Sequence, residues 1–83
     1  MTTEARNKLN QQQGSRWEWL LWAIDTADSH SLVARHKFRV EGYLLGLRDA
    51  GVLNEAEYTE LFEQATAREM AAANRTAPVR TSA

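Results

Sequence analysis

The stretch "LRDAGVLNEAEY", residues 47–58, contains the end of one helix and the start of the next. Gly51 can adopt the left-handed backbone conformation that closes a helix, and Val52 then has the spacing to contact Leu47 in a Schellman motif. Apolar residues before this turn recur at the period of a helix. The pattern predicts a helix over residues 31–50 that is closed by Gly51.

A second helix is predicted to begin almost immediately after this turn. Asn54 and Glu57 have the spacing of a capping box, in which each side chain accepts a hydrogen bond from the backbone amide of the other residue. Leu53 and Tyr58 have the spacing of a hydrophobic staple. We therefore expect a helix over residues 54–73, and the short connection favours an antiparallel αα-hairpin.

Another helix is predicted upstream of the hairpin. Ser15 and Glu18 form a further capping-box pattern, which predicts a helix over residues 15–28. Its apolar face repeats at helical spacing and consists of Trp17, Leu20, Leu21 and Ile24. Because Gly14 interrupts the sequence before this helix, we expect residues 1–14 to be flexible or frayed.

Length and composition favour one small domain. The 83 residues include no cysteine, so neither disulfides nor thiolate metal sites contribute to stability. Residues 74–83 lack helical periodicity, and we expect a disordered tail there. The predicted fold is all-α, a small three-helix domain over residues 15–73 built around the hairpin. Because so small a domain buries little surface, dimerisation is the expected additional source of stability.

The sequence also indicates where the protein resides. Its longest apolar run, residues 19–24, is far shorter than the ~20 residues that a membrane-spanning helix needs. The polar N-terminus lacks the apolar core of a signal peptide. A net charge of −1 provides no general attraction to nucleic acids or acidic membranes. We expect cytoplasmic residence and no membrane partner.

The three tryptophans of the chain lie within residues 17–22 and cannot share one helical face. Trp17 belongs to the apolar face described above, whereas Trp19 and Trp22 lie on the opposite side. Two exposed indoles form an apolar patch, so we expect the N-terminal segment, the helix over residues 31–50 or another molecule to cover them. The enrichment of tryptophan at interface hot spots favours another molecule.

The helix predicted over residues 31–50 has two apolar stripes. Phe38 and Leu45 lie opposite the main one, and Gly42 and Gly46 lie between the two at four-residue spacing. Two interpretations of the glycines remain open: they admit a bulky group such as an indole, or they are merely tolerated. The candidate interface residues are Trp19, Trp22, Phe38, Gly42, Leu45 and Gly46.

No pattern in the sequence predicts catalysis, a cofactor or a metal ion. His30 and His36 are six residues apart and do not share a helical face, as metal ligands on a helix usually do. His36 lies on the main apolar stripe, where we expect a hydrogen-bonded core or interface histidine rather than a base. Phosphate-loop and nucleophile-elbow motifs are absent. We expect the protein not to be an enzyme.

Two alternatives that involve nucleic acid follow from the charge pattern. Residues 31–53 carry a net charge of +2, and residues 54–73 carry one of −4. A dimer could place two basic patches side by side, each made of Arg35, Lys37 and Arg39. Pairing of these side chains with the acidic helix, or plain solvation, is the favoured interpretation of the same residues. Alternatively, the acidic helix could imitate a nucleic acid and block a DNA-binding protein.

The motif Leu-x-x-Ala-Gly-x-Leu-x-x-x-Glu-Tyr at residues 47–58 resembles helical hairpins in small accessory proteins of bacterial plasmids and phages. The resemblance implies a small bacterial accessory protein. Together with the unpaired tryptophans, it leads us to expect a protein–protein interaction module, an adaptor, regulator or inhibitor. Such a module would act as a homodimer or on a larger protein partner.

Overall fold

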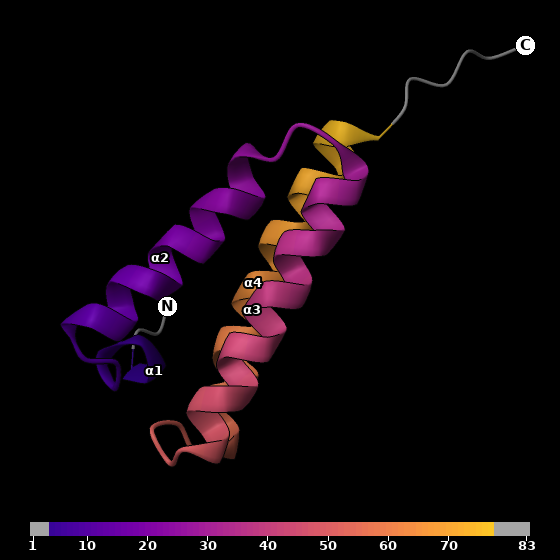
Figure 1. The fold of residues 1–83 in the computed structure, drawn as a ribbon. Helices are drawn as coiled ribbons and strands as arrows, with labels where there is room; N and C mark the ends of the chain where they lie inside the picture. Colours follow the sequence, from indigo (N-terminus) through magenta and orange to yellow (C-terminus); the bar gives the residue numbers. More distant parts are fainter. Residues whose placement is uncertain (1–3, 78–83) are drawn as a thin grey trace, which may run out of the picture.

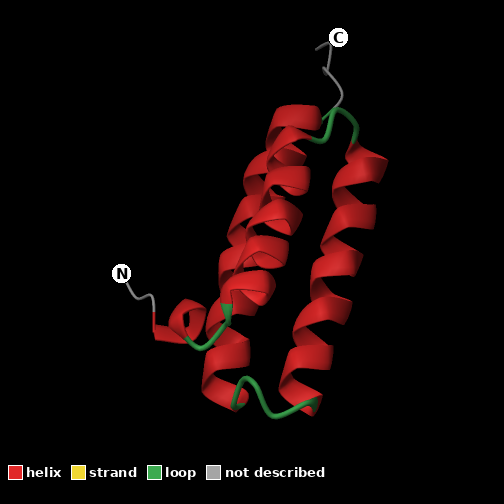
Figure 2. Cartoon of the chain, turned by 60° about the vertical axis from the view of Figure 1, so that its left-hand side comes forward, coloured by secondary structure: helices red, strands yellow, loops and turns green. Residues whose placement is uncertain are grey.

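The computed structural model describes residues 4–77, which form helices and no strand. The helices are α1 (Glu4–Asn7), α2 (Gln11–Thr26), α3 (His30–Asp49) and α4 (Glu55–Thr76). The three long helices pack against one another, and the short α1 packs against α4 near the start of α2 (Figures 1 and 2). The predicted all-α class is confirmed.

The turn that closes α3 has the predicted geometry. Gly51 has a φ of 81°, which is the left-handed conformation. The amide of Val52 donates to the carbonyl of Leu47 at 2.9 Å, and the amide of Gly51 donates to the carbonyl of Arg48 at 3.0 Å. These are the two hydrogen bonds of a Schellman motif, so this prediction is confirmed. The last helical residue is Asp49, one residue before the predicted end.

The start of α4 is also as predicted. The Asn54 side chain accepts from the Glu57 amide at 2.8 Å, and the Glu57 carboxylate accepts from the Asn54 amide at 2.8 Å. Leu53 is buried, and Tyr58 packs against the same core. Because the connection is short, α4 returns along α3, and the two helices lie side by side (Figure 1).

The predicted start of the first long helix is wrong. Helix α2 begins at Gln11, and its cap is Asn10. The Asn10 side chain accepts from the Gln13 amide at 2.8 Å, and the Gln13 side chain accepts from the Asn10 amide at 3.0 Å. This capping box lies upstream of the Ser15 pattern and provides hydrogen-bond acceptors for backbone amides at the start of the helix. Ser15 therefore lies inside the helix rather than at its start.

Gly14 does not interrupt α2, and its lack of a side chain leaves room for a side chain from α1. A Cβ at this position would stand 2.5 Å from an Nη atom of Arg6. The Arg6 guanidinium also forms an ion pair with Glu18 at 2.9 Å. Ala5 and Leu9 are buried in the core, so the segment expected to be frayed contributes apolar contacts where it is described. Residues 1–3 lie outside the described residues.

The other helix ends differ from the predictions by a few residues. Helix α2 ends at Thr26 instead of residue 28, because Ala27 is extended and leads to Ser29, which caps α3. Helix α4 continues to Thr76 instead of residue 73. Its last turn is held to the end of α2, since the Arg75 guanidinium donates to the carbonyl of Asp25 at 2.9 Å. Most of the tail predicted to be disordered, residues 78–83, lies outside the described residues.

The core lies between the three long helices and receives the predicted apolar face of each. Its largest fully buried side chains are Trp17, Ile24, Val33, Val40, Leu44, Leu53 and Leu61. A polar contact also joins α3 to the start of α2, because the Tyr43 hydroxyl donates to the carbonyl of Gln13 at 3.2 Å. Burial raises the pKa of this hydroxyl, so Tyr43 stays neutral and remains a donor.

Candidate interaction surface

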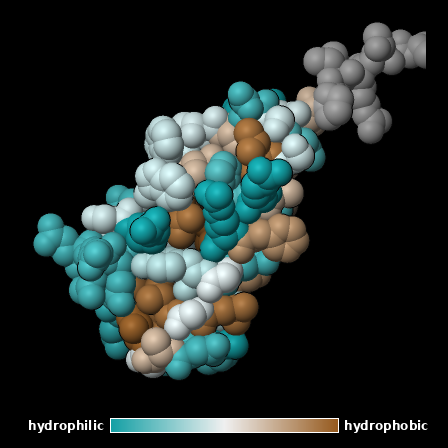
Figure 3. Space-filling view, viewed as in Figure 1, coloured by the Kyte–Doolittle hydropathy of each residue, from teal (hydrophilic) through white to brown (hydrophobic). Residues whose placement is uncertain are grey.

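The outer face of α3 exposes two large apolar side chains. Phe38 has 73% of its surface exposed and Leu45 has 39%. The two residues are seven apart, about two helical turns, so they lie on the same side of α3. The second apolar stripe predicted for this helix is therefore present. Phe38 also borders a hollow of about 130 Å³ that Glu69 of α4 helps to line, yet most of its surface stays exposed. In the view of Figure 3, apolar side chains are interspersed with strongly hydrophilic ones on the molecular surface.

The two glycines of α3 lie on this outer face and are open. A Cβ built at Gly42 or Gly46 would meet no atom within 4 Å. Hence no indole from the described chain fills the space at either glycine. Of the two interpretations left open by the sequence, packing of a bulky group from the same chain is excluded for residues 4–77.

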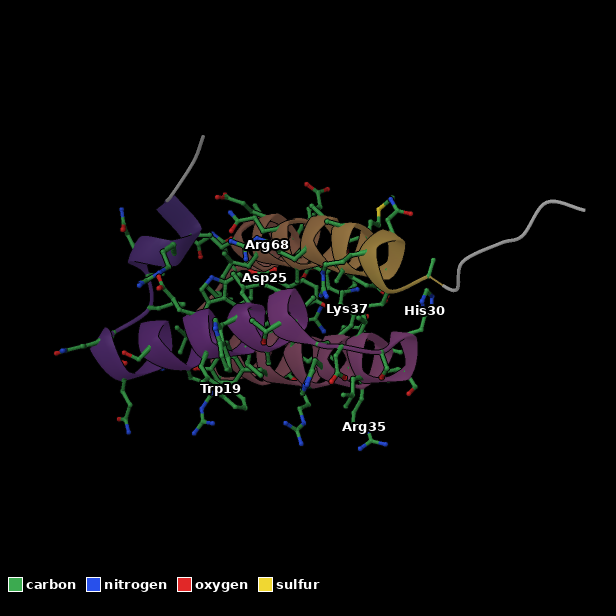
Figure 4. All side chains as sticks on the ribbon, turned by 90° about the horizontal axis from the view of Figure 1, so that it is seen from above. Trp19, Asp25, His30, Arg35, Lys37 and Arg68 are labelled. Carbon is green, nitrogen blue, oxygen red and sulfur yellow. The ribbon has the colours of Figure 1, made fainter. Side chains whose placement is uncertain are left out.

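Trp19 and Trp22 are both exposed, by 45% and 57%, but they do not form one patch. Trp19 borders a shallow hollow with Gln12, Ser15 and Arg16. In Figure 4, Trp19 and Arg35 lie on the same side of the molecule, away from α4. Trp19 is therefore on the side of the α3 outer face, while Trp22 turns toward α4.

Trp22 borders a hollow of about 300 Å³ between α2 and α4. The charged groups around this hollow are paired with each other: Arg68 with Asp25, and Arg6 with Glu18. Because each cation has a carboxylate partner, the hollow does not present a free charge for a charged ligand. The N-terminal segment reaches this hollow through Arg6 but leaves most of the Trp22 indole exposed.

The basic residues of α3 are not one surface patch. Arg35 and Arg39 are exposed, one turn apart, and neither forms an ion pair among the described residues. Lys37 instead is buried and faces α4 (Figure 4). Its ammonium nitrogen lies 3.1 Å from Glu41 and 3.3 Å from Glu69. Lys37 is thus not exposed beside Arg35 and Arg39 as the predicted patch requires, because its ammonium group lies against carboxylates of α3 and α4.

His36 lies on the inner side of α3, as predicted, but it is not fully hydrogen-bonded. Its Nδ1 atom is buried without a partner among the described residues. Burial and the nearby guanidinium groups of Arg39 and Arg35 lower the pKa of this imidazole. The His36 imidazole is therefore protonated less readily than a histidine in an unfolded chain.

Some of the acidic side chains of α4 cap the helix or form ion pairs within the protein. Glu57 caps its own helix, and its carboxylate lies 3.0 Å from the Lys8 ammonium. The amide of Asn54 and the Lys8 ammonium lower the pKa of this carboxyl. Glu69 pairs with Lys37.

In the part of the chain that the structure describes, no three histidine, cysteine or acidic side chains gather to hold a metal ion.

Met70 is an exposed apolar side chain that the sequence reasoning missed. It lies nine residues after the fully buried Leu61, and at about 100° per residue this spacing puts the two side chains on opposite sides of an α-helix. That spacing alone places Met70 on the outside of α4. It is therefore a matched exposed position on a different helix, useful as a control.

Comparisons with protein-family models, with curated proteins and with solved structures find no match to this chain. None of the helices within residues 4–77 is long and apolar enough to span a membrane.

Proposed function

We propose that this protein is a small protein–protein interaction module, a bacterial adaptor, regulator or inhibitor without catalytic activity, and that the outer face of α3 is its binding surface. The observation that carries the proposal is the exposure of Phe38 and Leu45 on one side of a helix whose opposite side forms the core. Trp19 of α2 lies on the same side of the molecule as Arg35 of α3 (Figure 4).

The free energy of hydrophobic burial supports this function. Fully burying one large apolar side chain contributes about 1.5–3 kcal/mol, so a surface with Phe38 and Leu45 gains substantially from a partner. Aromatic side chains are also concentrated at interface hot spots. The lack of cysteine fits a reducing compartment, so we place this interaction in the cytoplasm.

Nucleic-acid binding is the second candidate, because Arg35 and Arg39 are exposed and lack ion-pair partners among the described residues. Removal of Lys37 from the patch leaves Arg35 and Arg39 as the cations of α3 without an ion-pair partner among the described residues, since Arg48 pairs with Asp49 and Glu55, and this weakens the candidate. The mimicry alternative also loses support, since Glu57 and Glu69 have structural roles. Binding that disappears in Arg35→Ala/Arg39→Ala and falls steeply with salt would favour nucleic acid over protein.

Site-specific photocrosslinking tests the proposal. A benzophenone amino acid replaces Phe38 in one variant and the exposed Glu63 of α4 in a matched control, each expressed in the native host. The proposal predicts protein adducts from position 38 that are absent from position 63 and that disappear when Leu45→Lys is added. Adducts of equal yield from both positions, or none from position 38, would contradict it.

A further inference from the structure

We propose that the outer face of α3 binds the same face of a second copy of this chain, with the two helices antiparallel and crossing at Gly42. The inference rests on the proposed function, because it names the occupant of the same surface. The residues that form the contact are Arg35, Phe38, Gly42, Leu45, Gly46 and Asp49.

These positions form one continuous stripe on α3. Arg35, Phe38, Gly42, Leu45 and Asp49 follow one another at alternating intervals of three and four residues, the spacing with which one helix contacts another. Each of these residues is exposed, so the stripe is accessible along its length. A partner helix can therefore lie along the stripe without rearrangement of the core.

Charge determines the direction of the partner helix. In an antiparallel pair with its two-fold axis at Gly42, a residue before Gly42 faces the residue equally far after it on the second copy. Arg35 is seven residues before Gly42, and Asp49 is seven residues after it. The pair is thus joined by two Arg35–Asp49 contacts, one at each end. A parallel pair would instead place Arg35 against Arg35 and Asp49 against Asp49.

Both of these charged groups are available for such a contact. Arg35 has no ion-pair partner among the described residues, and the Asp49 side chain is 74% exposed, with its nearest cation, Arg48, 3.8 Å away. Asp49 is the last residue of α3, where a carboxylate opposes the helix macrodipole. A guanidinium from a second copy would compensate this unfavourable position.

The same register places Phe38 against a space on the facing helix. Phe38 is four residues before Gly42 and so faces Gly46 of the second copy, beside Leu45 of that copy. A side chain at a helix contact enters a space bounded by four residues of the facing helix, and two glycines make this space large enough for a phenyl ring. Glycine inside a helix costs about 1 kcal/mol relative to alanine, and nothing within 4 Å in the described chain accounts for this cost at Gly42 or Gly46.

Disulfide crosslinking tests the register directly, because the chain has no cysteine of its own. Gly42→Cys introduces a side chain at the two-fold axis, and its Cβ meets nothing within 4 Å in its own chain. The matched control is Ser31→Cys, which lies on the same side of α3. In the antiparallel pair its two copies are roughly 33 Å apart at a helical rise of 1.5 Å per residue. Under mild oxidation we expect a covalent dimer from Gly42→Cys and none from Ser31→Cys. Crosslinking of Ser31→Cys, or none from Gly42→Cys, overturns the antiparallel register.

Charge exchange tests the pairing independently. In sedimentation equilibrium, Arg35→Asp alone and Asp49→Arg alone should each raise the dimer Kd by about tenfold, because each replaces two attractive contacts with two repulsive ones. The double variant Arg35→Asp/Asp49→Arg should return the Kd to within about threefold of the wild-type value. Failure of the double variant to recover, or a wild-type protein that is monomeric up to about 1 mM, overturns the self-pairing.

The two proposals fail in different ways. If the wild-type protein is monomeric but position 38 crosslinks to another protein, the self-pairing is wrong and the proposed function stands. If position 38 forms no protein adduct of either kind, both are wrong.

Discussion

Lys37 on α3 and Phe62 on α4 form a cation–π contact, with the ammonium nitrogen 4.7 Å from the ring centroid. The same nitrogen is paired with Glu41 and Glu69, so a single buried cation joins an aromatic ring and two carboxylates across the interface of α3 and α4. Both carboxylates are about one-third exposed, which reduces the cost of burying this charged group.

Replacement of this cation should destabilise the fold. Lys37→Met leaves Glu41 and Glu69 without their common partner, and we expect the free energy of unfolding to fall by about 1–2 kcal/mol, since solvent screens part of the loss. Urea denaturation measures this change. Adding Glu69→Gln to Lys37→Met should recover part of the stability. A Lys37→Met variant as stable as the wild type would show that the ion-pair group makes no net contribution.

The start of α2 can be tested by two substitutions. Asn10→Ala removes the side chain that accepts from the Gln13 amide, and it should lower the free energy of unfolding by about 1 kcal/mol. Ser15→Ala, inside the helix, should leave stability unchanged or raise it by a few tenths of a kcal/mol. Thermal unfolding of both variants provides the comparison. The opposite order of stabilities would place the helix start at Ser15.

His36 should make the stability depend on pH. Its pKa is lower in the folded state than in the unfolded chain, because of burial and the charges of Arg39 and Arg35. As the pH falls below the unfolded pKa of about 6.5, the unfolded state binds more protons, and the free energy of unfolding decreases until the folded pKa is reached. His36→Leu removes this dependence and also removes the unpaired Nδ1. Chemical denaturation between pH 7.5 and pH 5 should therefore show a decline for the wild type and a flatter profile for the variant. Parallel profiles for the two proteins would exclude this role of His36.

Gly46→Ala should separate the stability of the monomer from the affinity of the dimer. Because a Cβ at this position meets nothing in the described chain, alanine should stabilise the dilute protein by about 1 kcal/mol through helix propensity. The same methyl group lies in the space proposed for Phe38 of the second copy, so the dimer Kd should rise. Gly51→Ala is the control, since its positive φ predicts destabilisation without a role in pairing. A Gly46→Ala variant with unchanged Kd would remove Gly46 from the contact.

The sequence predicted the helix ends correctly where a whole turn or capping motif lies within a few consecutive residues. Gly51, Asn54 and Glu57 define the turn and cap through contacts between residues at most a few positions apart, and those predictions are confirmed. Two equivalent signals competed at the start of α2. The Asn10–Gln13 box lies upstream of the Ser15 pattern, and Gly14 lies inside the helix, where its lack of a side chain lets Arg6 approach closely. Sequence spacing does not describe this contact between two helices.

Helical periodicity also predicted which side chains lie outside the core, but not how they group. Trp19 and Trp22 are both exposed as their spacing implied, yet α4 lies beside one and not the other. Lys37 lies two residues from Arg35 and two from Arg39, a spacing that places it on another side of α3, and its long side chain reaches carboxylates on α3 and α4. Both outcomes depend on the placement of α4, which the pattern of a single helix does not encode.

The proposed pairing of α3 with a second copy of the chain depends on Phe38. Sedimentation equilibrium of the wild type, Phe38→Asp and Met70→Asp tests this pairing, because the two variants place the same charge at exposed apolar positions on different helices. We predict that the wild type and Met70→Asp form dimers with the same Kd and that Phe38→Asp sediments as a monomer. Equal behaviour of Phe38→Asp and the wild type would contradict the claim.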